Sequence, residues 1–312
     1  MSLTDFPHVD PSRIPDPSPD VFTAPLQRPA HVGEDWLEPK QRDYTSEDHS
    51  VWDTLYERQL KVLPGRAVDV FMQGLDKLDL GAGGVPEFGK LSDKLNALTG
   101  WTIVPVPMLI PDHVFFYHLA NRRFPAGNFI RRRDNLDYIQ EPDVFHDVFG
   151  HAPMLTEPRF ADYMQDYGKA GWKAQRYNRL KALGALYWYT VEFGLIDTPQ
   201  GMRIYGAGIV SSAQEAVFAL EGKSPNRVHL NVDRVMRTDY VISDLQQTYF
   251  VIDSIDNLLH ETVDRPFDMI YKTLKPGFQF SPSAVLDTDR VYNVGTQEYA
   301  LRGGRGSGAT PV

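Results

Sequence analysis

The sequence predicts a mostly α-helical fold with a few short β-strands, arranged as a single domain. Apolar residues recur at helical spacing along most of the chain from residue 45 to residue 263. Strand-like runs are short and do not alternate with helices, and no fixed period repeats, which argues against a doubly wound sheet and against a solenoid. With 312 residues, 42% of them apolar, the chain is long enough to bury one sizeable core.

The first 40 residues carry eight prolines. Proline fixes φ and removes a backbone donor, so we expect a proline-rich extended arm over residues 1–40. From Thr45 on, residues suited to N-caps precede apolar residues at helical spacing, and Pro64-Gly65 interrupts the run. This pattern predicts a helical hairpin from residue 45 to about residue 80. A short helix is expected over residues 90–98, and residues 101–111 could supply one edge strand at most.

Helical patterns dominate the remainder of the chain. They predict helices over residues 112–121, 142–150, 158–172, 180–195, 211–220 and 254–263, with strands near residues 202–205 and 248–252. The chain closes on the glycine-rich run RGGRGSGATPV. We therefore expect a folded domain over residues 41–285 and a flexible C-terminal tail over residues 286–312.

Composition and charge exclude several classes of protein. The chain has no cysteine, so disulfides, thiolate zinc sites and iron–sulfur clusters are ruled out, and any metal must be held by His, Asp or Glu. A net charge of −9 argues against a nucleic-acid partner. No run of 18 apolar residues is present, and the first residues lack the basic and apolar regions of a signal peptide. We expect no nucleic-acid partner, no membrane association and a cytoplasmic location.

The strongest chemical signal is the run Pro142-Asp143-Val144-Phe145-His146-Asp147-Val148-Phe149-Gly150-His151. Its two histidines lie five residues apart in an otherwise apolar helical stretch. On an undistorted α-helix they would point about 140° apart, so a shared metal requires some distortion, for which Gly150 offers a place. The alternative is that both are satisfied core histidines.

Glu192 is the second anomaly. Between residues 182 and 196 it is the only ionisable acid or base other than tyrosine. A carboxylate in such an apolar wall is costly unless it is paired, hydrogen-bonded or bound to a metal. Two histidines and one carboxylate form the facial triad of non-haem Fe(II) oxygenases, although a His2Glu zinc site uses the same donors. For Glu192 alone, a buried salt bridge to an arginine is the alternative.

Two further groups lie just upstream. Arg131-Arg132-Arg133 is the kind of charge run that usually forms a solvated face, but one of these arginines could bind a substrate carboxylate with two hydrogen bonds. Phe115-Phe116-Tyr117 could belong to the core, or could offer an exposed ring that stacks on a flat heterocycle.

The residues from about 101 to 215, with weaker similarity to about residue 267, resemble a known family. The motifs that carry the resemblance, in order, are Thr99-Gly100-Trp101, Phe129-Ile130-Arg131, Glu141-Pro142-Asp143 with His146 and Gly150-His151, Trp188-Tyr189-Thr190-Val191-Glu192-Phe193-Gly194, and Tyr205-Gly206-Ala207-Gly208 with Ser211-Ser212. They are similar to those of the pterin-dependent aromatic amino acid hydroxylases, most closely the bacterial phenylalanine 4-hydroxylases.

The resemblance implies a single catalytic domain of the aromatic amino acid hydroxylase type, with iron and pterin held by residues 41–285. It assigns Fe(II) to His146, His151 and Glu192, and the pterin to Phe115, Tyr187 and Asp147. Substrate-binding residues would be Arg131, Pro142, Trp188, Phe193 and Ser211. The implied reaction converts L-phenylalanine, O2 and a tetrahydropterin, such as tetrahydrobiopterin, into L-tyrosine and 4a-hydroxypterin.

The chain also departs from part of the family. Animal members usually have Glu, His and Thr where this chain has Asp147, Pro125 and Ile139, and Asp147 is typical of bacterial members. The residues before Trp101 do not resemble the regulatory domain, and the tail lacks a heptad pattern, so we expect a monomer. Three alternatives remain: hydroxylation of tryptophan or tyrosine, a His2Glu zinc hydrolase, and a non-catalytic protein with a buried polar cluster.

Overall fold

The structure is a computed structural model that describes residues 27–139, 141–262, 265, 267–274 and 279–307 of the chain. Its helices are α1 (Ser46–Val62), α2 (Asp69–Lys77), α3 (Phe88–Thr99), α4 (Asp112–Ala120), α5 (Pro158–Arg176), α6 (Leu180–Tyr187), α7 (Ala207–Val210), α8 (Ala213–Glu221), α9 (Val232–Val235), α10 (Ile255–Thr262), α11 (Phe267–Thr273) and α12 (Glu298–Leu301). Its strands are β1 (Thr102–Val106), β2 (Arg123–Gly127), β3 (Leu195–Thr198), β4 (Gly201–Ile204), β5 (Asn226–His229), β6 (Thr248–Ile252) and β7 (Val291–Asn293).

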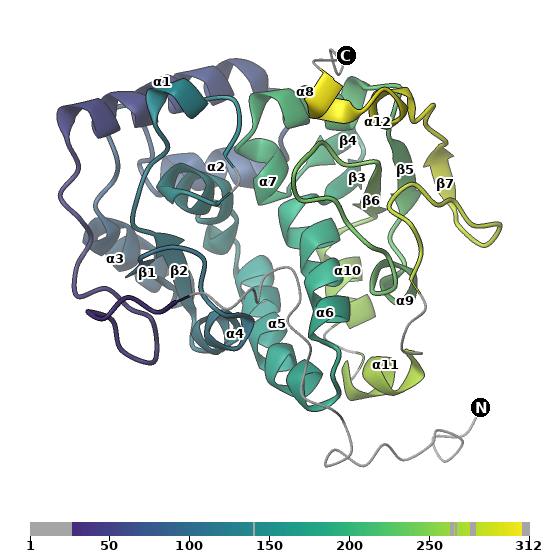
Figure 1. The fold of residues 1–312 in the computed structure, drawn as a ribbon, viewed down its shortest axis with the longest axis horizontal. Helices are drawn as coiled ribbons and strands as arrows, with labels where there is room; N and C mark the ends of the chain where they lie inside the picture. The colour runs from purple at the N-terminus through teal and green to yellow at the C-terminus, as the bar shows by residue number, and fades with distance from the viewer. Residues whose placement is uncertain (1–26, 140, 263–264, 266, 275–278, 308–312) are drawn as a thin grey trace.

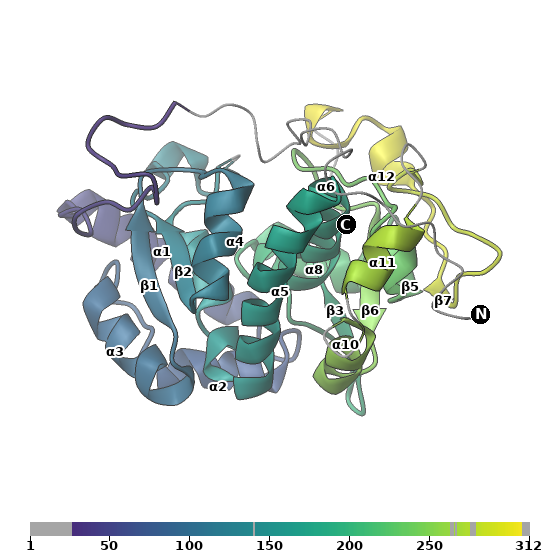
Figure 2. The ribbon, with the colours of Figure 1, turned by 90° about the horizontal axis from the view of Figure 1, so that it is seen from below.

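The elements form two halves around the central helices α5 and α6 (Figure 1). One half holds α1 to α4 with the two-stranded parallel sheet β1-β2, and the other holds a five-stranded sheet in the order β4-β3-β6-β5-β7. Seen at right angles, α5 and α6 again lie between the two sheets (Figure 2). In the larger sheet β6 pairs in parallel with both β3 and β5, and all five of its residues are buried. Such continuous burial is typical of a central parallel strand.

The predicted fold class is confirmed, and most predicted helices are present. Those expected over residues 45–80, 90–98, 112–121, 158–172 and 211–220 correspond to α1 with α2, α3, α4, α5 and α8, while α10 matches the helix expected over 254–263 as far as residue 262. The strands expected near 202–205 and 248–252 are β4 and β6, and β1 lies within 101–111. Among the described residues, no helix combines the length and apolar character that a membrane span needs.

Two predicted helices differ from α-helical geometry. Residues 145–151, which overlap the helix expected over 142–150 and extend one residue beyond it, form a π-helix. The helix expected over 180–195 is α-helical to Tyr187, continues as a π-helix through Glu192, and gives way to β3 at Leu195. The sequence pattern missed the short elements β2, β3, β5, β7, α7, α9, α11 and α12.

Part of the expected tail is packed onto the larger sheet. β7 pairs antiparallel with β5, and Tyr299 of α12 is buried against Phe218. The Tyr299 hydroxyl also donates a hydrogen bond to Asp244. Residues 1–26 of the expected arm and residues 308–312 of the expected tail lie outside the described residues, so the domain boundaries stay a prediction.

Two glycines of α5 let this helix approach α4 closely. A Cβ on Gly168 would lie 2.2 Å from the backbone nitrogen of Ala120, and a Cβ on Gly171 would lie 2.2 Å from the ring of Phe116. Real side chains do not tolerate such distances, so larger residues would push α4 outward. Because α4 also carries Phe115, the two glycines set the position of that ring.

Gly168→Ala is therefore expected to lower the free energy of unfolding by about 1–3 kcal/mol, because the added methyl meets backbone atoms that cannot rotate away. Gly89→Ala is the matched control. Gly89 is exposed in α3 with no atom within 4 Å of its Cβ position, so the substitution should be neutral or stabilise by up to about 1 kcal/mol. Chemical denaturation measures both, and equal effects of the two substitutions would contradict the close contact.

Glu215 of α8 is a buried acid that joins this helix to β6. It accepts hydrogen bonds from the backbone N–H of Gln246, at 3.1 Å, and from the hydroxyl of Tyr249. Burial raises the pKa of Glu215 from its ordinary 4.5 to about 7, although both hydrogen bonds act to lower it. The folded protein therefore holds a proton on Glu215 at pH values where the unfolded chain has released it.

Because the pKa of Glu215 is higher in the folded state, its stabilising contribution is complete below pH 4.5 and is lost as the pH rises to 7. This loss amounts to about 3 kcal/mol. Glu215→Gln keeps the shape of the side chain without titrating. Between pH 5 and pH 7.5 the unsubstituted protein should lose this contribution, whereas Glu215→Gln should not. We therefore expect the free energy of unfolding of Glu215→Gln, minus that of the unsubstituted protein, to increase over this pH range. A difference that is constant across this range would show that Glu215 is not protonated in the fold.

Candidate active site

The three candidate metal ligands come from the two π-helical segments. His146 and His151 lie in Phe145–His151, and Glu192 is the last residue of Trp188–Glu192. A π-helix closes hydrogen bonds between residues five apart, as the backbone N–H of Phe193 shows by bonding the carbonyl of Trp188 at 2.8 Å. A spacing of five therefore brings His146 and His151 to the same side of the helix. The distortion expected at Gly150 alone is instead spread over the whole segment.

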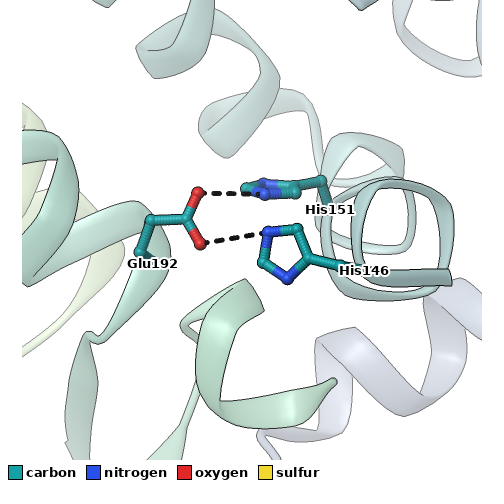
Figure 3. Close-up of side chains that lie close together, drawn as sticks. All are labelled: His146, His151 and Glu192. Carbon is teal, nitrogen blue, oxygen red and sulfur yellow. Dashed lines mark ion pairs between the residues drawn. The ribbon is translucent and has the colours of Figure 1, made fainter. Parts of the chain in front are cut away.

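The side chains of His146, His151 and Glu192 converge (Figure 3). Glu192 Oε2 lies 3.4 Å from Nε2 of His146, and Glu192 Oε1 lies 3.1 Å from Nε2 of His151. One ligand atom from each residue falls within 4.8 Å of the others. Adjacent ligands of a six-coordinate ion with bonds of about 2.1 Å lie roughly 3 Å apart, so these distances suit one face of such an ion.

The protonation states also suit a cation. Burial raises the pKa of Glu192, but the two histidines and hydrogen bonds from His151 and Tyr187 outweigh it and hold this pKa below its ordinary value. Burial lowers the pKa of His146 to about 4, so its imidazole is neutral at pH 7. Its Nδ1 lies 3.0 Å from Ser211 Oγ, and a proton donated there leaves the Nε2 lone pair facing the carboxylate. Two acceptors that face each other in this way fit a metal ion between them.

The arrangement argues against the alternatives for these residues. Among the described residues, the basic side chains within 4.0 Å of the Glu192 carboxylate are the two histidines, and no arginine pairs with it, so a salt bridge to an arginine across the core is the wrong interpretation. The two histidines are buried or nearly so, as core histidines would be. However, both imidazoles face the same carboxylate, whereas core histidines would each have a hydrogen-bond partner of their own. The predicted triad is therefore assembled in the fold.

A mainly apolar cavity of about 110 Å³ adjoins the triad. Four of the residues singled out from the sequence line it together with the three ligands: Phe115, Pro142, Asp147 and Tyr187. The rings of Phe115 and Tyr187 meet edge to face, with centroids 5.5 Å apart. The cavity thus offers a flat molecule an aromatic wall beside the candidate metal site.

Asp147 gives this cavity a carboxyl group that can be protonated or ionised near neutral pH. It is buried and accepts a hydrogen bond from the backbone N–H of Gly127 at 2.7 Å. Burial raises the pKa of Asp147 to about 7 despite that hydrogen bond. A carboxyl group with such a pKa can either accept or donate a hydrogen bond near neutral pH.

Arg131 is already paired in this structure. Its guanidinium binds Asp143 through two hydrogen bonds of 2.9 and 2.8 Å, and Asp143 also accepts from the backbone N–H groups of Arg131 and His146. Burial raises the pKa of Asp143, but these contacts outweigh it and keep the pKa below its ordinary value. Arg131 and Ser211 line a second cavity, and Ser211 links it to the first through its hydrogen bond with His146.

The other two arginines of the run are solvated, as a charge run predicts. Arg132 is largely exposed and Arg133 forms an exposed ion pair with Glu47. Sequence reasoning missed the role of Asp143 in fixing Arg131 and the start of the π-helix. An acidic residue three positions before His146 is the spacing of an N-cap, and this signal could have identified it.

Trp188 and Phe193 pack against each other, with ring centroids 4.7 Å apart. Trp188 also stacks on Tyr240 at 4.8 Å and donates its indole N–H to Gln246 Oε1 at 2.8 Å. Both rings belong to the wall behind Glu192 and are not among the described residues that line either cavity.

Known proteins resemble this chain over most of its length. The family model described as biopterin-dependent aromatic amino acid hydroxylase matches residues 38–281. The phenylalanine-4-hydroxylase of Caulobacter vibrioides is 56% identical over 276 residues, covering 88% of this chain and 94% of that protein. The phenylalanine-4-hydroxylase of Ralstonia nicotianae is 57% identical over 256 residues, covering 82% of this chain and 81% of that protein.

Solved structures show the same likeness. The phenylalanine hydroxylase of Chromobacterium violaceum with bound iron(III) and 7,8-dihydrobiopterin matches with a TM-score of 0.79 at 50% identity, covering 88% of this chain and 99% of that one. Its structure with iron and phenylalanine matches with a TM-score of 0.80. With the family model matching over most of its length and relatives above 50% identity, the chain belongs to the biopterin-dependent aromatic amino acid hydroxylases.

Proposed function

We propose that this chain is a phenylalanine 4-monooxygenase, which converts L-phenylalanine, O2 and a tetrahydropterin into L-tyrosine and 4a-hydroxypterin at a non-haem Fe(II) centre. The observation that carries the proposal is the convergence of His146, His151 and Glu192 beside a mainly apolar cavity. The relatives that bear the name phenylalanine-4-hydroxylase support the choice of substrate over tryptophan or tyrosine.

His146, His151 and Glu192 would hold Fe(II). Bound Fe(II) and tetrahydropterin supply the activation of O2 and the delivery of one oxygen atom to the substrate ring. Phe115 and Tyr187 orient the pterin from the aromatic wall of the cavity, and Asp147 offers its carboxyl group to the polar edge of the heterocycle. The mainly apolar lining of this cavity excludes water from the reacting atoms.

The amino acid is oriented from the second cavity. Arg131 binds the substrate carboxylate, while Asp143 fixes the plane of its guanidinium. Ser211 lies beside the same position and keeps His146 in the tautomer that a metal requires. Pro142, which lines the cavity beside the triad, walls the side that receives the aromatic ring. Trp188 and Phe193 line neither cavity and would support this side through their packing next to Glu192. The family match over residues 38–281 supports a catalytic iron and pterin domain over residues 41–285.

The decisive test follows tyrosine formation from L-phenylalanine by metal-free protein, with Fe(II) and tetrahydropterin added, in air and under argon. We expect product only when iron, pterin and O2 are all present. Glu192→Ala should lower both iron content and product formation by at least about a hundredfold, because it removes a ligand. Glu87→Gln, which alters an exposed acid, is the control and should match the unsubstituted protein.

Other outcomes of this experiment have different meanings. Hydroxylation of tryptophan or tyrosine, with no product from phenylalanine, would keep the iron centre and replace the substrate. Absence of O2 consumption with every aromatic amino acid, together with bound zinc, would contradict the oxygenase and favour a hydrolase.

The assembly and location belong to the same proposal: a monomer in the cytoplasm. The C-terminal α-helix that the structure describes, α12, has only four residues and cannot form a coiled coil. Sedimentation equilibrium should therefore give a single species close to the chain mass of 35.4 kDa. A stable tetramer at micromolar concentration would overturn the monomer.

A further inference from the structure

A short segment before the first helix packs against the cofactor cavity from outside. We call residues 31–40 the N-terminal strap. Its Trp36 is 5% exposed and forms a small separate core with Val106, Ile110 and Val114, to which Phe115 also contributes. In both ribbon views this dark purple segment lies beside the ends of β1 and α4 (Figures 1 and 2).

Three residues of this small core also face the cavity. Val106, Ile110 and Phe115 all line the cavity beside the triad, whereas Trp36 does not. The indole therefore supports the cavity wall from behind. Because Trp36 does not line the cavity, a change at Trp36 would act on a bound molecule through the residues of this core.

This part of the cavity wall needs support because its backbone forms few hydrogen bonds with other segments. The loop between β1 and α4, residues 107–111, has prolines at both ends, which lack an N–H group. Within the described part of the chain, no hydrogen bond joins the backbone of residues 108–110 to another segment. Apolar packing is then the main interaction that fixes Met108, Leu109 and Ile110, all of which line the cavity.

The strap itself is held firmly. The backbone N–H of Glu38 donates to the carbonyl of Pro105 at 2.9 Å, and the carbonyl of Asp35 lies 2.8 Å from Nε2 of the fully buried His118. The amide of Asn128 donates to the Glu38 carboxylate at 2.6 Å and to the carbonyl of Lys40 at 3.1 Å. These bonds join the strap to β1, to α4 and to the residue that follows β2.

The backbone of Trp36 is also unusual. Its φ of 59° lies in the left-handed region, which bulky side chains rarely adopt. Such a conformation persists only where the surroundings enforce it, and strained residues of this kind concentrate at functional sites. Here the strain is offset by burial of the indole against the cavity wall.

We propose that Trp36 is a positioning residue for the pterin: it holds the loop at residues 107–111 at the distance from Phe115 that a flat heterocycle requires. This inference rests on the proposed function. It assigns the end of the proline-rich arm to the cofactor site, and it predicts a loss of pterin affinity without a loss of iron or of substrate binding.

The test measures binding of 7,8-dihydrobiopterin to the iron-loaded protein by calorimetry, for Trp36→Ala and Trp36→Phe. We expect Trp36→Ala to raise the Kd roughly five- to tenfold and Trp36→Phe to restore most of the affinity, because a phenyl ring keeps part of the packing. Iron content and the KM for phenylalanine should stay within about twofold of the unsubstituted values. Hydrogen exchange at residues 106–112 should become faster in Trp36→Ala.

Leu258→Ala is the matched control, because Leu258 is fully buried in α10, away from this wall. It should lower stability and leave the pterin Kd unchanged. If the unsubstituted protein binds no pterin, the proposed function fails. If it binds pterin and Trp36→Ala binds equally well, or if Leu258→Ala weakens binding as much, the role of Trp36 is overturned. If Trp36→Ala does not fold, the test uses Trp36→Leu and Trp36→Phe. Both should raise the Kd for 7,8-dihydrobiopterin, and the variant that loses more contact area should raise it more.

Discussion

The metal centre depends on how tightly the backbone winds between His146 and His151. Residues five apart come to the same side of a helix when the backbone winds as a π-helix, with hydrogen bonds between residues five apart. An isolated chain would favour α-helical winding, so tertiary contacts must hold the wider turn. Two such contacts come from the segment around α7. A Cβ added at Gly150 would lie only 3.0 Å from the carbonyl oxygen of Ala207, so the two backbones are in close contact. The hydroxyl of Ser211 forms a hydrogen bond with the imidazole of His146. The second π-helix ends on Glu192, so both ligand-bearing helices depart from α-helical winding where the ligands lie.

Burial of charge beside this centre imposes a second constraint. A carboxylate in an apolar interior must be compensated, and Asp143 is compensated by Arg131 together with two backbone N–H groups. One of these N–H groups belongs to His146. The Asp143 carboxylate therefore fixes both the guanidinium of Arg131 and the backbone of His146. The proposed orientation of the substrate and the geometry of the metal ligands thus depend on the same buried carboxylate.

The sequence was most informative where a residue contradicted its surroundings. Glu192 stands alone among apolar residues, and this isolation alone marks it as a candidate ligand. The spacing of the two histidines predicted some distortion but not a π-helix over the whole segment, because this winding depends on contacts with α7, more than fifty residues away along the chain. Trp188 is held by Gln246, a partner 58 residues away. The prolines before residue 40 predicted an extended arm, whereas burial of Trp36 depends on the later loop that it covers.

The small parallel sheet explains why a mostly helical protein needs β1 and β2 at this site. Parallel pairing places the carboxyl ends of both strands at one edge, with Val106 opposite Gly127. Both residues line the cavity, and ligands commonly bind beyond this edge in parallel sheets. The N–H of Gly127 binds Asp147 there, the residue that follows the first histidine. Two strands of five residues thus fix the distance between the loop supported by Trp36 and the helix that carries the metal ligands.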